Sequence, residues 1–121
     1  MKLIVAGSRV GFVARNVFEA IEESPFYGKI TEIVSGGAKG VDRDGEYFAK
    51  CNNLPIKQFI PDWNKYGKAA GMIRNHEMAE YADALVAVWD GKSRGTQHMI
   101  LNMQKTGKPV YVHLVGEQNK T

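Results

Sequence analysis

The stretch IVSGGAKGVD, residues 33–42, decides how the chain is expected to fold. A run of β-forming residues leads directly into a glycine-rich turn that carries one lysine and ends on an acid. Such a sequence is typical of a buried parallel strand that passes through a tight turn into a helix. Successive glycines also let backbone N–H groups point into one concavity, which suits a phosphate. The stretch therefore predicts a strand, a turn and a helix, with a candidate anion site at the turn.

The rest of the chain repeats this strand-to-helix pattern. Short apolar runs predict strands at 3–6, 32–35, 56–60, 84–89 and 110–114, and amphipathic stretches between them predict helices, the third at about 69–81 and the fourth from 96 to about 105. This alternation predicts an α/β fold, a Rossmann-like doubly wound sheet of about five mainly parallel strands with helices on both faces. Residues 1–121 are expected to form a single domain with a frayed polar tail at 116–121.

Composition excludes several classes of protein. The chain has 121 residues, a net charge of +3 and one cysteine, and no apolar run approaches the roughly 20 residues that span a bilayer. An internal disulfide and a zinc site are therefore not expected. We expect a cytoplasmic protein that does not bind membranes and has no metal site of its own. Mg²⁺ is expected only together with a phosphorylated ligand, through Asp42 or Asp90.

Three loops are expected at the edge of the sheet where ligands of such folds bind, beyond the carboxyl ends of the strands. Each combines glycine with a cation and a hydroxyl group, which suits a phosphate. One such loop alone is more often a simple turn, but the three together favour an anion site. The spacing matches neither a Walker A loop nor G-x-G-x-x-G, so ATP hydrolysis and hydride transfer are not predicted. The candidate ligand-binding residues in these loops are Gly7, Ser8, Arg9, Ser35, Gly36, Gly37, Lys39, Gly40, Asp42, Asp90, Gly91, Ser93, Arg94, Gly95 and Thr96.

The order of the motifs resembles the YspA/cpYpsA-related branch of the SLOG superfamily over nearly the whole chain. The matching segments are Gly7-Ser8-Arg9, residues 35–42, Pro61-Asp62-Trp63, Ala70-Gly71 with Arg74-Asn75, Ala82-Asp83, and 89–91 with Gly95-Thr96. The resemblance implies a Rossmann-like domain, related to LOG enzymes and to DprA, that binds a nucleotide or nucleotide-derived ligand, in some relatives in phage or antiphage settings. It also implies a homodimer as one option. It adds Arg74 and Asn75 to the candidate ligand-binding residues, and Trp63 for stacking on a base or packing over its loop.

A comparison with the LOG enzymes, which cleave the N-glycosidic bond of nucleoside monophosphates, bears on catalysis. The position that resembles their catalytic glutamate holds Met99. A thioether cannot accept a proton or stabilise an oxocarbenium ion, so hydrolysis by the same route is not expected. Asp42 and Asp90 are the candidate catalytic carboxylates for a deoxyribosyltransferase-like route. For each of them, a structural role or a bond to a ribose hydroxyl is favoured over catalysis.

Three functions remain, and whether the protein is an enzyme stays open. The first is binding of a nucleotide-type small molecule, such as an ADP-ribose or NAD-derived species, for sensing or sequestration. The second is cleavage of the N-glycosidic bond of a nucleoside or nucleotide, such as a nucleoside 5′-phosphate, by a deoxyribosyltransferase-like or LOG-like N-glycosidase. The third is a DprA-like, DNA-associated accessory role, which ranks last because no aromatic-rich basic strip is evident in the sequence. Nucleic acid is therefore not an expected partner.

Overall fold

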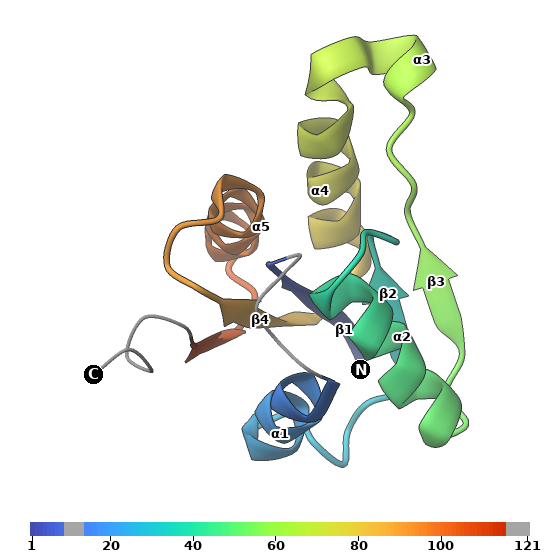
Figure 1. The fold of residues 1–121 in the computed structure, drawn as a ribbon, viewed down its shortest axis with the longest axis vertical. Coiled ribbons are helices and arrows are strands. Elements are labelled where there is room, and N and C mark those ends of the chain that lie inside the picture. The colour runs from blue at the N-terminus through green and yellow to red at the C-terminus, as the bar shows by residue number, and fades with distance from the viewer. Residues whose placement is uncertain (9–13, 116–121) are drawn as a thin grey trace.

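The structure is a computed structural model that describes residues 1–8 and 14–115 (Figure 1). The predicted site residue Arg9 and the predicted tail at 116–121 lie outside these residues. The predicted α/β fold is confirmed. The elements in chain order are β1 (Lys2–Gly7), α1 (Ala14–Glu23), β2 (Glu32–Ser35), α2 (Val41–Cys51), β3 (Ile56–Gln58), α3 (Trp63–Tyr66), the 3₁₀ helix η1 (Gly67–Ala69), α4 (Ala70–Tyr81), β4 (Ala84–Trp89), α5 (Arg94–Lys105) and β5 (Val110–Leu114).

The five strands form one parallel sheet with the order β3-β2-β1-β4-β5. β1 therefore pairs with β2 on one side and with β4 on the other, although β4 follows much later in the chain. Strand order reverses at β1, and in an open parallel sheet such a reversal leaves a crevice beyond the carboxyl ends of the strands.

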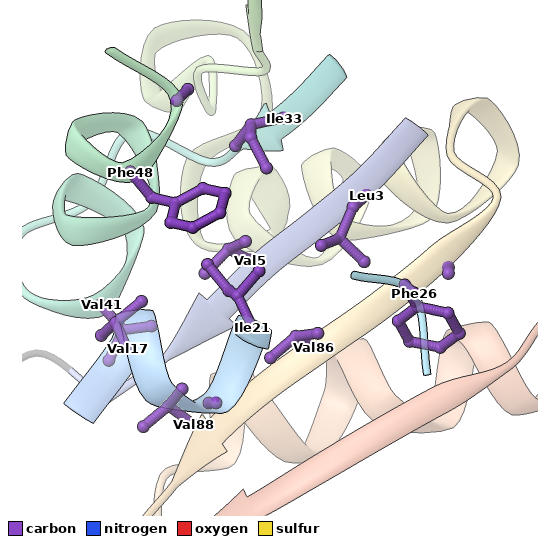
Figure 2. Close-up of a cluster of buried hydrophobic side chains, with 13 residues drawn as sticks. Leu3, Val5, Val17, Ile21, Phe26, Ile33, Val41, Phe48, Val86 and Val88 are labelled. Atoms are coloured by element: carbon purple, nitrogen blue, oxygen red, sulfur yellow. The ribbon is translucent and has the colours of Figure 1, made fainter. Parts of the chain in front are cut away.

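Helices cover both faces of the sheet, as a doubly wound fold requires (Figure 1). Alternate residues of β1 point to opposite faces. Leu3 and Val5 pack in the cluster that contains the buried side chains of α1 and α2 (Figure 2). Ile4 and Ala6 pack in the second cluster, with the buried methionines of α4 and α5. Both faces of β1 are thus buried, which explains why its sequence is apolar without alternation.

Three details differ from the predicted elements. β3 ends at Gln58 rather than at residue 60, because its last partner on β2 is Ser35, the final residue of that strand. The helix before β5 begins at Arg94, two residues earlier than predicted. α3 and η1 were not predicted. α3 begins at Trp63, directly after the capping residue Asp62, whose carboxylate accepts the N–H of Lys65.

None of the described helices is both long enough and apolar enough to cross a membrane.

Candidate functional site

A pocket of about 370 Å³ opens at the carboxyl edge of the sheet, at the reversal of strand order. Its walls come from the end of β1, the loops that follow β1, β2 and β4, the start of α2, and residues of α4 and α5. The volume lies within the range of small-molecule sites. The lining residues are Ala6, Gly7, Ser8, Gly36, Ala38, Asp42, Arg74, Asn75, Met78, Asp90, Ser93, Gly95, Thr96 and Met99.

Arg74 is the cation that lines this pocket among the described residues. It reaches from α4 to the loop after β2, where its Nη1 donates to the carbonyl oxygens of Gly36 at 2.7 Å and Phe59 at 3.4 Å. Its Nε donates to Oδ1 of Asn75 at 2.9 Å. These contacts hold the guanidinium at the pocket wall, where a ligand would meet it in a fixed orientation.

Asp42 is a buried carboxyl group at the start of α2. Burial raises its pKa from the ordinary 3.8 to about 6, while the Ala38 N–H, 3.3 Å from Oδ2, and the Arg74 guanidinium act in the opposite direction. Gly36 lies between the two charged side chains: a Cβ on it would be 2.5 Å from Nη1 of Arg74 and 2.9 Å from Oδ2 of Asp42. The close approach of Arg74 and Asp42 therefore depends on glycine at position 36.

The pKa of Asp90 is shifted in the opposite direction to that of Asp42. Its Oδ1 accepts the backbone N–H groups of Lys92 at 2.8 Å and Ser93 at 2.9 Å, and these bonds lower the pKa of the carboxyl group. The loop after β4 is further stabilised by Trp89, whose Nε1–H donates to the Ser93 carbonyl at 3.0 Å. One pocket thus contains a carboxyl group that is held ionised and another that is easily protonated.

The N-terminus of α5 adds hydrogen-bond donors. The first N–H groups of a helix have no carbonyl partner one turn earlier, and they carry partial positive charge. Gly95 and Thr96 belong to this first turn and line the pocket. Ser93, the residue before the helix, makes no side-chain cap bond to these N–H groups. An anion in the pocket would therefore find donors that the described protein leaves open.

Ser8 supplies a further unsatisfied group. Ser8 lines the pocket and is 4% exposed. Its Oγ makes no hydrogen bond to any described residue. The hydroxyl group nevertheless lies near enough to Asp90 to contribute to the lowered pKa of that carboxyl group. A buried hydroxyl without a partner costs about 1–3 kcal/mol, and a ligand atom could remove that cost.

Asn75 links the two helices at the pocket. Its Nδ2 donates to the Gly95 carbonyl at 3.3 Å and lies 3.2 Å from Nδ1 of His98. Burial lowers the pKa of His98, which favours the neutral ring that can accept this bond. The contacts place α4 and the N-terminus of α5 at a fixed separation on one side of the pocket.

Among residues 1–8 and 14–115, no cluster of three or more His, Cys, Asp or Glu side chains is arranged to hold a metal ion.

No known protein-family profile matches the chain. The gene 61 protein of Mycobacterium phage D29 is 34% identical over 119 residues, an alignment that covers 90% of this chain and 93% of the phage protein. The chain belongs to the gene 61 protein family.

The fold of this gene 61 family member is that of a part of DprA. The solved structure of DNA processing protein A (DprA) from Streptococcus pneumoniae matches with a TM-score of 0.74 over 96% of this chain, at 19% identity. The chain spans half the length of DprA. At this identity the likeness establishes the shared fold.

Many residues predicted for the site of the gene 61 family protein do line the pocket. They come from all three predicted loops and from the Arg74-Asn75 pair: Gly7, Ser8, Gly36, Asp42, Arg74, Asn75, Asp90, Ser93, Gly95 and Thr96. The predicted residues that do not line it are Ser35, Gly37, Lys39, Gly40, Trp63, Gly91 and Arg94.

Three of these residues bear on the predicted chemistry of the site. Lys39 and Arg94 were expected to supply positive charge, but both are exposed and neither lines the pocket. Ser35 was expected to be a ligand donor, but its Oγ donates to Glu46 at 2.7 Å and accepts the Gly37 N–H at 3.0 Å. The Ser35 hydroxyl therefore stabilises the loop instead of facing the pocket.

Sequence reasoning missed the small and apolar members of the wall, Ala6, Ala38 and Met78, and treated Met99 only as a lost catalytic group. Met78 could have been found, because it lies four residues after Arg74 and so shares its helix face. Met99 lies three residues after Thr96 and is 1% exposed at the pocket wall. The thioether therefore stands at the pocket, where the LOG comparison expects a carboxylate.

Proposed function

We propose that this gene 61 family protein binds a nucleotide or nucleotide-derived ligand in the pocket at the carboxyl edge of β1 and β4. We also propose that it belongs to the YspA/cpYpsA-related branch of the SLOG superfamily. The observation that supports binding is the convergence of three strand-end loops, the Arg74 guanidinium and the first turn of α5 on one pocket. Sensing or sequestration of the ligand requires no chemistry beyond this arrangement.

The donors and acceptors suggest how the ligand would lie. A phosphate would accept from the N–H groups of Gly95 and Thr96, the Ser8 hydroxyl and the Arg74 guanidinium. The carboxylate of Asp90 would accept from ribose hydroxyl groups. Because the one lining cation among the described residues shares the pocket with two carboxyl groups, a ligand with one or two phosphates fits the charge balance better than a triphosphate.

Thermal unfolding in the presence of nucleoside mono-, di- and triphosphates, NAD and ADP-ribose tests the proposal. A ligand at 100 times its Kd stabilises the folded protein by about 2.7 kcal/mol, which raises Tm by several degrees for a domain of this length. We expect such a rise for a mono- or diphosphate compound. Unchanged melting across the whole panel at millimolar ligand would contradict the proposal.

Gly36→Ala is expected to weaken binding of that ligand, so that its Kd rises at least tenfold. The new Cβ would lie 2.5 Å from Nη1 of Arg74, so the guanidinium must leave the pocket wall. A charge-assisted hydrogen bond contributes about 1.5–3 kcal/mol, which corresponds to a tenfold to hundredfold change in Kd. Isothermal titration calorimetry measures the change.

The matched control for this variant is Gly71→Ala, since a Cβ at Gly71 meets only Trp63, at 3.6 Å, away from the pocket. The control should bind as the natural protein does. If the Gly36→Ala variant binds the ligand with the same affinity as the natural protein, Arg74 does not take part in binding.

A second candidate function is N-glycosidic hydrolysis, and it is favoured by the two carboxyl groups of opposite pKa shift in one pocket. Asp42, with a pKa of about 6, would protonate the leaving base, and ionised Asp90 would stabilise the oxocarbenium ion. Chromatography of nucleoside 5′-monophosphates after long incubation detects free base. This function is supported if the natural protein releases free base and the Asp42→Asn and Asp90→Asn variants do not. It is excluded if the nucleotides stay intact with the natural protein at high concentration.

A further inference from the structure

The segment between β3 and the first turn of α4 projects beyond the sheet. Figure 1 shows α3 at the far end of α4, away from the strands. We call residues 60–72 the arm. Neither α3 nor η1 contains a buried residue. The arm nevertheless carries four large apolar or aromatic side chains with high exposed fractions: Ile60 (63%), Trp63 (55%), Tyr66 (39%) and Met72 (57%).

Trp63 is exposed but held in place. A Cβ on Gly71 would be 3.6 Å from Cη2 of Trp63, so the indole ring rests against α4 at a residue without a side chain. The Asp62 carboxylate caps α3 by accepting the Lys65 N–H at 3.0 Å. These contacts order a short helix that has no buried residue and hold the Trp63 ring in a fixed position at the surface.

Lysines alternate with these rings, so the arm is a short aromatic and basic segment that the sequence pattern alone did not indicate as a binding strip. Along residues 63–68 the order is Trp-Asn-Lys-Tyr-Gly-Lys, and Lys65 and Lys68 are both exposed. The Nζ of Lys65 lies 5.1 Å from the centre of the Tyr66 ring, within the range of a cation–π contact. The acid of the arm, Asp62, directs its carboxylate to the start of α3. The Asp62 carboxylate and that of Glu77 on α4 also lie near enough to Lys65 to favour its charged form, so the exposed surface of the arm combines two aromatic rings and two lysines with these acids.

We propose that the arm binds single-stranded nucleic acid, with bases stacked on Trp63 and Tyr66 and phosphates paired with Lys65 and Lys68. Proteins that bind single strands without sequence preference combine aromatic rings for the bases with positive charge for the backbone. The bases of a single strand match the aromatic rings of the arm, and its phosphates match the lysines. The proposal concerns a surface separate from the pocket, since none of these four residues lines it.

A second copy of the chain fits the arm less well. In a symmetric dimer the same patch meets itself, so Lys65 and Lys68 of both copies would lie around the two-fold axis. Like charges at that position oppose association. The phosphates of single-stranded nucleic acid would instead attract the ammonium groups of these lysines.

The affinity for a fluorescein-labelled oligo(dT), measured by anisotropy at several salt concentrations, tests the arm. Trp63→Ala with Tyr66→Ala is expected to weaken binding at least tenfold, because each base–aromatic stack contributes substantially. Lys65→Ala with Lys68→Ala is expected to reduce the slope of log K against log salt by about 1.4, since each phosphate contact on a single strand contributes about 0.7.

Two controls separate the arm from other surfaces. Tyr27→Ala with Tyr47→Ala removes two tyrosines of similar exposure, 53% and 55%, that lie outside the arm, and should bind as the natural protein does. Gly36→Ala, which disturbs the pocket, should also keep its affinity for the oligonucleotide, so a failure of the arm and a failure of the pocket are told apart.

Three results would overturn the inference. The first is no binding of the oligonucleotide by the natural protein at low salt. The second is unchanged affinity and salt slope in both arm variants. The third is a dimer of the protein alone in sedimentation that Trp63→Ala with Tyr66→Ala converts to a monomer, because the arm would then be covered by a second copy.

Discussion

Asp42→Asn is expected to stabilise the protein above pH 6 by about 2–3 kcal/mol and to flatten its stability between pH 4 and pH 6. Burial raises the pKa of the folded carboxyl group from 3.8 to about 6. In this window the unfolded chain has lost the proton and the folded protein still holds it. Stability therefore falls as pH rises from 4 to 6, and each pKa unit corresponds to 1.36 kcal/mol. Asparagine keeps an oxygen for the Ala38 N–H but never acquires the charge.

Urea unfolding of the natural protein and the variant from pH 4 to pH 8 measures this difference. Asp90→Asn is the opposing control, because backbone N–H groups lower the pKa of the Asp90 carboxyl group. Its charge stabilises the folded protein above the unfolded pKa and loses that effect as pH falls through the lowered value. The Asp90 variant should therefore be less stable at neutral pH. A natural protein whose stability does not fall between pH 4 and pH 6 relative to Asp42→Asn would contradict the expected shift.

Gly7→Ala is expected to lower the free energy of unfolding by roughly 3 kcal/mol or more. A Cβ at this position would lie 2.1 Å from the carbonyl oxygen of Val88 and 2.9 Å from Cγ2 of Val41. Gly7 pairs with Val88 at the end of β1, and the following Ser8 carbonyl accepts the Val41 N–H at 3.2 Å. The methyl group can be accommodated only if β1 separates from β4 or from the start of α2.

Chemical unfolding of the Gly7→Ala variant at neutral pH measures the loss. Gly95→Ala is the comparison, since a Cβ there meets no atom within 4 Å and should change stability little. A loss below about 1 kcal/mol for Gly7→Ala would mean that the strand ends can separate at small cost.

The fold was largely predictable because its strands are buried on both faces and are joined by short turns. β2, β4 and β5 begin and end at the predicted residues, where apolar runs meet polar or glycine-rich segments. α3 was not predictable from periodicity, because it spans four residues and buries none of them. Its visible signal is the capping residue Asp62, which alone does not distinguish a helix from a turn.

The site was predictable at the level of loops and less so at the level of side chains. Parallel topology places Gly7, Asp42 and Thr96 at one edge of the sheet, because the carboxyl ends of parallel strands lie at the same edge. The direction of Lys39 does not follow, because it depends on a turn in which Gly37 and Gly40 both adopt positive φ values, 74° and 81°. A long-range contact such as that of Arg74 with the Gly36 carbonyl does not follow from local sequence pattern and was not predicted. The family resemblance gave only Arg74 itself as a candidate ligand-binding residue.

The pairing of β1 with β4 has a mechanical consequence. Among the described strands, it is the pairing that joins the early part of the sheet, β1 to β3, to the late part, β4 and β5. The pocket lies across this junction, with walls from Ala6 to Asp42 on one side and from Arg74 to Met99 on the other. A ligand that contacts both walls would hold the two parts of the sheet together. The early and late halves of the molecule would then separate only after the ligand has dissociated.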